Sequence, residues 1–133
     1  MKLAGLLLAA GGATRFGSPK VLAPFHGKPL VRRGVQLLMP RCQAGVHVVV
    51  GASADGVRAA LAAESVSIVE NPDWASGLST SLVRGVAALP AAADAVLILL
   101  CDQPAITADD LDALIAAWQV EPELIAEIGR AHV

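Results

Sequence analysis

Apolar runs alternate with stretches of helical spacing along this chain, a pattern typical of strands that are each followed by a helix. Continuous apolar or β-branched runs predict four strands, at residues 3–9, 46–50, 66–69 and 95–100. Apolar spacing and composition predict four helices, at residues 30–38, 56–63, 78–89 and 108–118. Strands separated by helices favour right-handed crossovers and therefore a mostly parallel sheet between helices, a three-layer α/β/α Rossmann-like fold.

Polar residues, glycines and prolines predict where these elements begin and end. Residues 11–29 are expected to form a loop, with Pro29 in the first turn of the first helix and Pro40 stopping it. Asp55 is expected to cap the second helix. Thr107, followed three residues later by Asp110, predicts a capping box at the start of the last helix.

The length of 133 residues indicates one domain with a single core. The chain is 55% hydrophobic but only 3% aromatic, as expected of buried parallel strands packed against alanine-rich helices. A net charge of −2 gives no basic field for a nucleic acid. Cys42 and Cys101 lack metal-ligand spacing and join no histidine cluster, which argues against a zinc site and a disulfide framework.

Two features bear on targeting. No apolar segment reaches the ~18 residues of a membrane helix. Met1 and Lys2, followed by an apolar stretch to Ala10, have the outline of a short signal peptide, so a secreted interaction domain is one alternative. Cleavage there would remove the first predicted strand and its glycine turn, which favours a cytoplasmic protein.

The last seven residues, 127–133, continue neither pattern and match the translation of a common sequencing adapter. We therefore expect a non-native tail there. Residues 1–126 are then expected to form the native part of the chain, as one domain.

Residues 11–20 combine glycines that follow a strand with two cations, Arg15 and Lys20. Such a loop lets backbone N–H groups approach phosphates, so it predicts a phosphate cradle. The spacing fits neither the dinucleotide fingerprint nor the Walker pattern, which argues against a hydride-transfer enzyme and a P-loop ATPase. The alternative is a solvated glycine turn with two surface charges.

Two further segments follow predicted strands, where ligands bind in open parallel sheets. Asp102 comes just after the strand at residues 95–100 and is the candidate ligand of a hard cation, the alternative being an aspartate in a turn before Pro104. Residues 71–81 lead into a helix and offer a glycine, hydroxyls and backbone donors to an anion, the alternative being a turn and a helix cap. Trp74 could stack on a ring or anchor the surface.

These segments resemble one enzyme family. The run LAAGGATRFGSPK at residues 8–20 is similar to the L-A-A-G-x-x-x-R-[FM]-G-x-x-K signature of the MobA-like NTP transferases, which include the molybdenum cofactor cytidylyltransferases. DQP at residues 102–104 resembles the cytidylyltransferase branch, and residues 71–81 resemble the family's N-P-x-W-x-x-G-x-x-x-S segment. The resemblance implies a fold of the nucleotide-diphospho-sugar transferase type and covers roughly residues 3–118, the N-terminal part of such an enzyme. It therefore implies that residues 1–126 are a nucleotide-binding domain of an NTP transferase whose C-terminal part is missing.

The resemblance also implies a reaction, the transfer of CMP from CTP to a phosphorylated, molybdopterin-type acceptor with release of pyrophosphate. Arg15 and Lys20 would be catalytic, and Asp102 would hold Mg²⁺. A molybdoenzyme chaperone would be a possible partner. Transfer of guanylyl or another nucleotidyl group, or nucleotide binding without catalysis, are the alternatives. The residues implied to bind the substrates are Ala10, Gly11, Gly12, Arg15, Lys20, Asn71, Gly77, Ser79 and Ser81.

Overall fold

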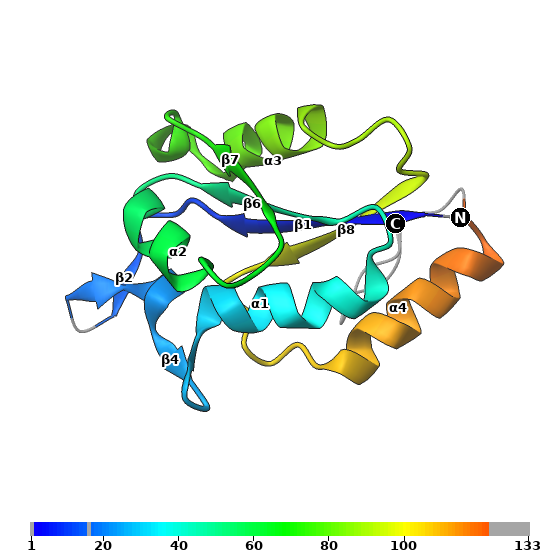
Figure 1. The fold of residues 1–133 in the computed structure, drawn as a ribbon, viewed down its shortest axis with the longest axis horizontal. Coiled ribbons are helices and arrows are strands. Elements are labelled where there is room, and N and C mark those ends of the chain that lie inside the picture. Colours follow the sequence, from blue (N-terminus) through cyan, green and yellow to red (C-terminus); the bar gives the residue numbers. More distant parts are fainter. Residues whose placement is uncertain (1, 16, 123–133) are drawn as a thin grey trace. The chain divides into compact units, whose positions relative to one another are not determined.

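A computed structural model describes residues 2–15 and 17–122 of the chain (Figure 1). The tail expected at residues 127–133 lies outside the described residues. Two compact units divide the chain, Met1–Gln103 and Pro104–Val133. Within the described residues, no helix is long and apolar enough to cross a membrane.

The first unit is built on a four-stranded parallel sheet with the strand order β7-β6-β1-β8. Its strands lie close to the predicted runs: β1 at Leu3–Ala9, β6 at Val46–Val50, β7 at Ser67–Glu70 and β8 at Ala95–Leu100. Strands β1 and β6 are buried along their whole length, which explains the unbroken apolar sequence of β1 and the four valines of β6, where His47 is the one polar residue. The predicted parallel α/β sheet is confirmed.

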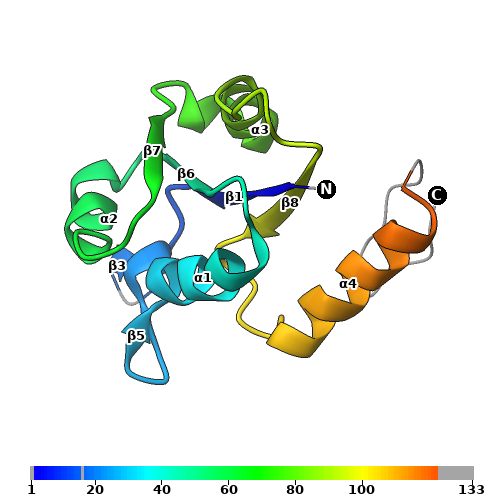
Figure 2. The ribbon, with the colours of Figure 1, turned by 45° about the vertical axis from the view of Figure 1, so that its right-hand side comes forward.

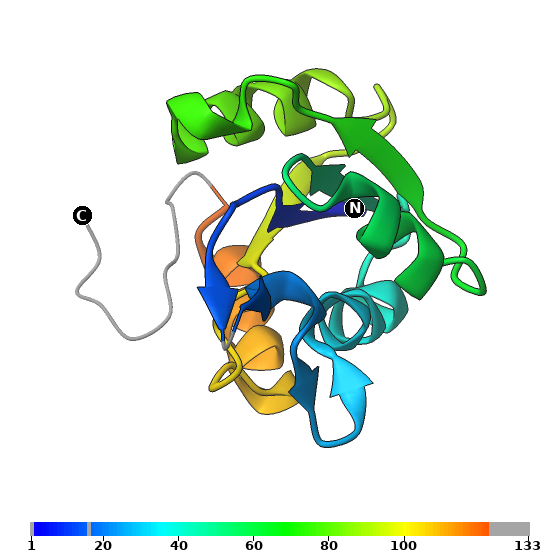
Figure 3. The same ribbon diagram turned by 90° about the vertical axis from the view of Figure 1, so that its left-hand side faces the viewer.

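Helices cover both faces of this sheet, as Figures 1 and 3 show. Helix α1, Leu30–Leu38, packs on one face, where Gly34 lies against Leu7 of β1. Helix α3, Leu78–Ala87, packs on the other, where Gly85 lies against Leu6 of β1 and Val49 of β6. A side chain at either glycine would push the helix away from the sheet, because a Cβ there would lie 2.8 Å or less from a leucine methyl carbon.

Helix α2, Ala54–Ala60, begins earlier than the sequence indicated. Its N-cap is Ser53, and Asp55 lies in the first turn, so the predicted cap at Asp55 was wrong. Pro29 likewise precedes α1 as its N-cap residue, whereas the first helical turn was expected to contain it. Both differences are shifts of one or two residues at a helix start, where hydrophobic periodicity carries little information.

Residues 11–29 were expected to be a loop, and this was wrong. They contain two short antiparallel ribbons, shown in Figure 2: β2 at Thr14–Arg15 pairs with β3 at Ser18–Pro19, and β4 at Pro24–Phe25 pairs with β5 at Lys28–Pro29. A 3₁₀ turn, Lys20–Leu22, joins the ribbons. Two-residue strands are too short to show an alternating pattern, so the sequence could not reveal them.

The second unit contains helix α4, Ala108–Val120. Its capping box is formed as predicted: Asp110 N–H donates to Thr107 Oγ1 over 3.2 Å, and Thr107 N–H donates to Asp110 Oδ2 over 2.9 Å. These two bonds satisfy donors that the first turn of a helix otherwise leaves without partners.

Candidate functional site

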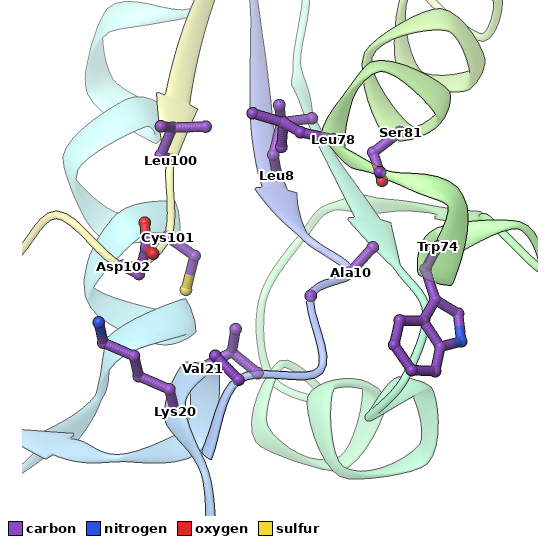
Figure 4. Close-up of a pocket in the computed structure, with 13 residues that line it drawn as sticks. Leu8, Ala10, Lys20, Val21, Trp74, Leu78, Ser81, Leu100, Cys101 and Asp102 are labelled. Carbon is purple, nitrogen blue, oxygen red and sulfur yellow. The ribbon is translucent and has the colours of Figure 1, made fainter. Parts of the chain in front are cut away.

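The carboxyl ends of the parallel strands meet at one edge of the sheet, and a pocket opens there (Figure 4). Backbone hydrogen bonds hold the segments that leave the strands together at this edge. Ala52 N–H donates to the Ala10 carbonyl over 3.1 Å, and Asn71 N–H donates to the Val50 carbonyl over 2.8 Å. The pocket therefore lies where open α/β sheets place their ligands.

Six of the ten predicted site residues line the pocket. They come from three separate segments of the chain, which only the parallel sheet brings together. The first predicted loop supplies Ala10, Gly11 and Lys20, the start of α3 supplies Gly77 and Ser81, and the end of β8 supplies Asp102. Apolar side chains that the sequence did not assign, among them Leu8, Val21, Leu78 and Leu100, complete the wall.

Lys20 and Asp102 are the charged groups of the pocket. Figure 4 shows the Lys20 amine pointing toward the Asp102 side of the cavity. No ion pair joins the two among the described residues, and no hydrogen bond within that part of the chain engages either side chain. One cation and one anion thus face the same cavity and remain available to a ligand that carries both phosphates and a metal ion.

The backbone at Gly11 is open, because a Cβ there would meet nothing within 4 Å. Close by, Lys20 N–H donates to the Ala13 carbonyl over 2.9 Å, which closes the β2–β3 ribbon and holds Lys20 at the cavity. An exposed glycine backbone beside a lysine is an arrangement that can accommodate a phosphate group.

Four predicted residues lie outside the pocket lining. Arg15 is exposed on the β2–β3 ribbon, and Ser79 is exposed on α3. Gly12 lies against the indole of Trp74. Asn71 is 1% exposed and donates from Nδ2 to Ser81 Oγ over 2.8 Å and to Thr80 Oγ1 over 2.9 Å. The ligand contacts predicted for all ten residues remain predictions.

Cys101 lines the pocket beside Asp102 and is 6% exposed. Burial, with a smaller contribution from the neighbouring Asp102 carboxylate, raises the pKa of the Cys101 thiol to about 12. The thiol is therefore neutral near pH 7, and only a thiolate acts as an effective nucleophile. Cys101 serves as a small buried wall residue.

Trp74 is the functional candidate that the sequence left undecided. It lines the pocket opposite Lys20 and is 37% exposed (Figure 4). In the sequence, Trp74 stands out because it lies two residues after Pro72 and shortly after a predicted strand. The sequence cannot show which loop its indole contacts.

The model of the MobA-like NTP transferase domain matches residues 5–131, nearly the whole chain. The chain belongs to this family. The match includes all three segments that form the pocket and agrees with the resemblance noted in the sequence.

The curated relatives that this chain matches carry different names. Nicotine blue oxidoreductase of Paenarthrobacter nicotinovorans is 35% identical over 114 residues, which are 85% of this chain and 55% of that protein. The bifunctional protein GlmU of Azotobacter vinelandii is 38% identical over 128 residues, which are 95% of this chain and 27% of that protein. The chain therefore spans about half or less of the length of these relatives.

Solved structures share the fold. A nucleotidyl transferase from Methanothermobacter is 28% identical with a TM-score of 0.75, over 86% of this chain and 57% of that one. The Rv0371c protein of Mycobacterium tuberculosis, crystallised in complex with manganese, is 25% identical with a TM-score of 0.70, over 90% of this chain and 61% of that one. The fold is that of nucleotidyltransferases of the nucleotide-diphospho-sugar transferase type.

Proposed function

We propose that the pocket binds a nucleoside triphosphate with a divalent cation and transfers the nucleotidyl group to a phosphorylated acceptor. One observation carries the proposal: Lys20 and Asp102, from two distant segments, face the same cavity beside the open backbone of Gly11. Membership of an NTP transferase family supports the same reading.

In this reaction an oxygen of the acceptor phosphate attacks the α-phosphorus of the nucleotide. The bond from that phosphorus to the bridging oxygen breaks, and pyrophosphate leaves. The protein contributes position and charge more than covalent chemistry. Lys20 offsets negative charge on the triphosphate, and backbone N–H groups near Gly11 donate to its oxygens. Arg15 is assigned the same kind of role from the exposed β2–β3 ribbon, on the strength of the family signature.

Mg²⁺ is the cation that we assign to Asp102. The described residues contain no group of three or more acidic, histidine or cysteine side chains that could hold a metal ion on their own. A single exposed carboxylate suits Mg²⁺, which is usually bound by one or two carboxylates together with substrate phosphates and water. Bound there, the ion would neutralise charge on the phosphates. Manganese in the related Mycobacterium tuberculosis structure supports a divalent ion in this family.

Within this general reaction, we propose CTP as the nucleotide donor and a molybdopterin-type compound as the acceptor. The choice of CTP rests on Ala10 and Gly11 in the first motif and on Gln103 and Pro104 after the aspartate, which resemble the cytidylyltransferase branch. This assignment implies that the protein acts in the cytoplasm and passes its product to a molybdoenzyme chaperone.

The relative named as an oxidoreductase supports a second candidate, a redox enzyme built on the same nucleotide-binding fold. The two candidates differ in their products. A nucleotidyltransferase releases pyrophosphate in the presence of an acceptor, whereas a redox enzyme changes the oxidation state of its substrate and releases no pyrophosphate. A module that only binds nucleotide does neither.

The deciding experiment is calorimetric titration of the chain with CTP, GTP and ATP, with and without Mg²⁺, followed by pyrophosphate release with a molybdopterin acceptor. We expect CTP to bind most tightly and only with Mg²⁺. Lys20→Ala should lower the rate by about 10²-fold, the typical loss when one charge-stabilising group is removed. Asp102→Asn should remove the Mg²⁺-dependent binding of CTP.

Lys28→Ala is the matched control, because Lys28 is an exposed lysine of β5 whose Nζ donates to Gln36 Oε1 over 2.7 Å, outside the pocket lining. It removes the same charge and should leave binding unchanged. Turnover near that of the unmodified chain in Lys20→Ala, or binding of no nucleotide by the folded chain, would refute the proposed function.

A further inference from the structure

The side chain of Trp74 lies against Gly12 of the glycine loop, defined as residues 10–13, and against Gly51. A Cβ on Gly12 would lie 2.7 Å from Cζ3 and 3.1 Å from Cη2 of Trp74. A Cβ on Gly51, just after β6, would lie 2.7 Å from the Cβ of the same residue. Real Cβ atoms do not approach so closely, so the indole fits only because both positions are glycine.

Gly12 and Gly11 differ in what surrounds them. The three nearest atoms that a Cβ on Gly12 would meet all belong to Trp74, whereas a Cβ on Gly11 would meet nothing within 4 Å. Gly51 differs again, because its Cβ would also lie 2.8 Å from the Ala10 carbonyl oxygen and would disturb backbone whatever residue stood at position 74. Gly12 is thus the position at which the indole alone excludes a side chain.

A hydrogen-bond network fixes the segment that carries Trp74. The Asn71 side chain donates to Thr80 Oγ1 and Ser81 Oγ on α3, and its Oδ1 accepts from Asp73 N–H over 3.0 Å. Thr80 Oγ1 donates to the Gly77 carbonyl over 2.7 Å, and Gly77 N–H donates to the Trp74 carbonyl over 3.3 Å. The backbone that carries the indole is therefore held on both sides of Trp74.

We propose that Trp74 is a positioning residue of the nucleotide site: anchored by Asn71 and α3, its indole sets the conformation of the glycine loop, and Gly12 is glycine to admit the indole. This inference rests on the proposed function. It assigns different tasks to adjacent glycines, since Gly11 faces the ligand and Gly12 faces Trp74. It also gives buried Asn71 a supporting role.

A double-mutant cycle tests the inference. The chain has two tryptophans, Trp74 and Trp118. The parent protein for this experiment therefore carries Trp118→Phe, so that Trp74 is its single tryptophan. Gly12→Ala, Trp74→Ala and the double variant are compared for the Kd of CTP with Mg²⁺. Gly12→Ala should weaken binding about tenfold in the parent and less than about twofold when Trp74→Ala is already present, the coupling expected of residues in contact. Gly11→Ala is the matched control, and it should change the Kd of CTP by the same factor with and without Trp74→Ala.

Fluorescence without nucleotide gives a second, independent measurement. Gly12→Ala should shift the Trp74 emission to longer wavelength and increase its quenching by acrylamide, because the ring must move away from the loop. Gly11→Ala should do neither. This readout keeps Trp74 in place, so it does not depend on the folding of Trp74→Ala.

The outcomes separate the inference from the proposed function. If the parent binds CTP but Gly12→Ala costs the same with and without Trp74, or leaves the emission unmoved, the positioning role is overturned and the proposed function stands. If the parent binds no nucleotide, the proposed function fails and the role of Trp74 in a nucleotide site fails with it, whatever the emission shows.

Discussion

The two cysteines show how burial can dominate the chemistry of a residue. Burial raises the pKa of the Cys42 thiol to about 11, although the neighbouring Arg41 charge lowers it in part. Burial and the adjacent Asp102 raise the pKa of Cys101 to about 12. Both values lie above the ordinary thiol pKa of 9.0, so both thiols are neutral throughout the physiological range.

The stability of the protein should therefore fall above pH 9. In the unfolded chain the thiols ionise from about pH 9, whereas the folded thiols keep their protons, so the folded state binds more protons and loses stability as pH rises toward 11 and 12. The chain contains no tyrosine that would titrate in the same range. Urea unfolding under reducing conditions between pH 7 and 10.5 measures this slope. It should flatten in the double variant Cys42→Ala and Cys101→Ala, and an unchanged slope would contradict the assignment.

At the scale of elements, the sequence can predict a hydrogen bond between residues that are close together in the chain. The capping box of α4 joins Thr107 to Asp110, three residues apart, and was predicted from those two residues. The ribbons β2–β3 and β4–β5 are equally local but were missed. Their turns pass through Gly17 and Gly27, at φ values of 79° and 83°, so the glycines were visible although their turn geometry was not.

Thr107→Ala should destabilise the start of α4 by about 1 kcal/mol, the usual effect of losing an N-cap oxygen. Hydrogen exchange of the α4 backbone amides is the appropriate measurement, because it reports on this helix separately from the sheet. Thr14→Ala, at an exposed position of β2, is the control and should leave the α4 amides unchanged. Equal protection of α4 in both variants would show that the capping box contributes nothing.

At the scale of the whole molecule, an apolar surface follows α3 and the edge strand β8. Leu78 is 58% exposed, Val83 69% and Val86 46% on α3, and Ile98 of β8 is 41% exposed. Within the described part of the chain, β8 pairs with β1 alone, so its other edge has no strand beside it. Exposed apolar surface next to an open edge favours association between molecules.

This 133-residue chain should therefore self-associate as its concentration rises. Val83→Lys should shift the equilibrium toward the monomer, because a charge on the α3 surface must be desolvated in any contact there. Ala59→Lys adds the same charge at an exposed position of α2 and is the control. Sedimentation velocity over a range of concentrations distinguishes them, and identical behaviour of the two variants would rule out the α3 surface as the contact.

The sequence by itself determined the four strands of the parallel sheet, the four helices and the residues that follow each of these strands. Apolar and β-branched runs predicted the four strands of the parallel sheet within a residue, most clearly for β1, whose burial along its whole length favours an unbroken apolar sequence. Motif resemblance placed Lys20 and Asp102 among the site residues, and both line the pocket.

Only the tertiary structure decided which neighbours those residues acquire. The strand order β7-β6-β1-β8 brings together segments that are tens of residues apart, and so places Trp74 on Gly12, Asn71 beneath α3 and the Cys101 thiol out of water. Periodicity and motif spacing describe contacts within a segment. Crossover connections create contacts between segments, and the shape of the pocket depends on these.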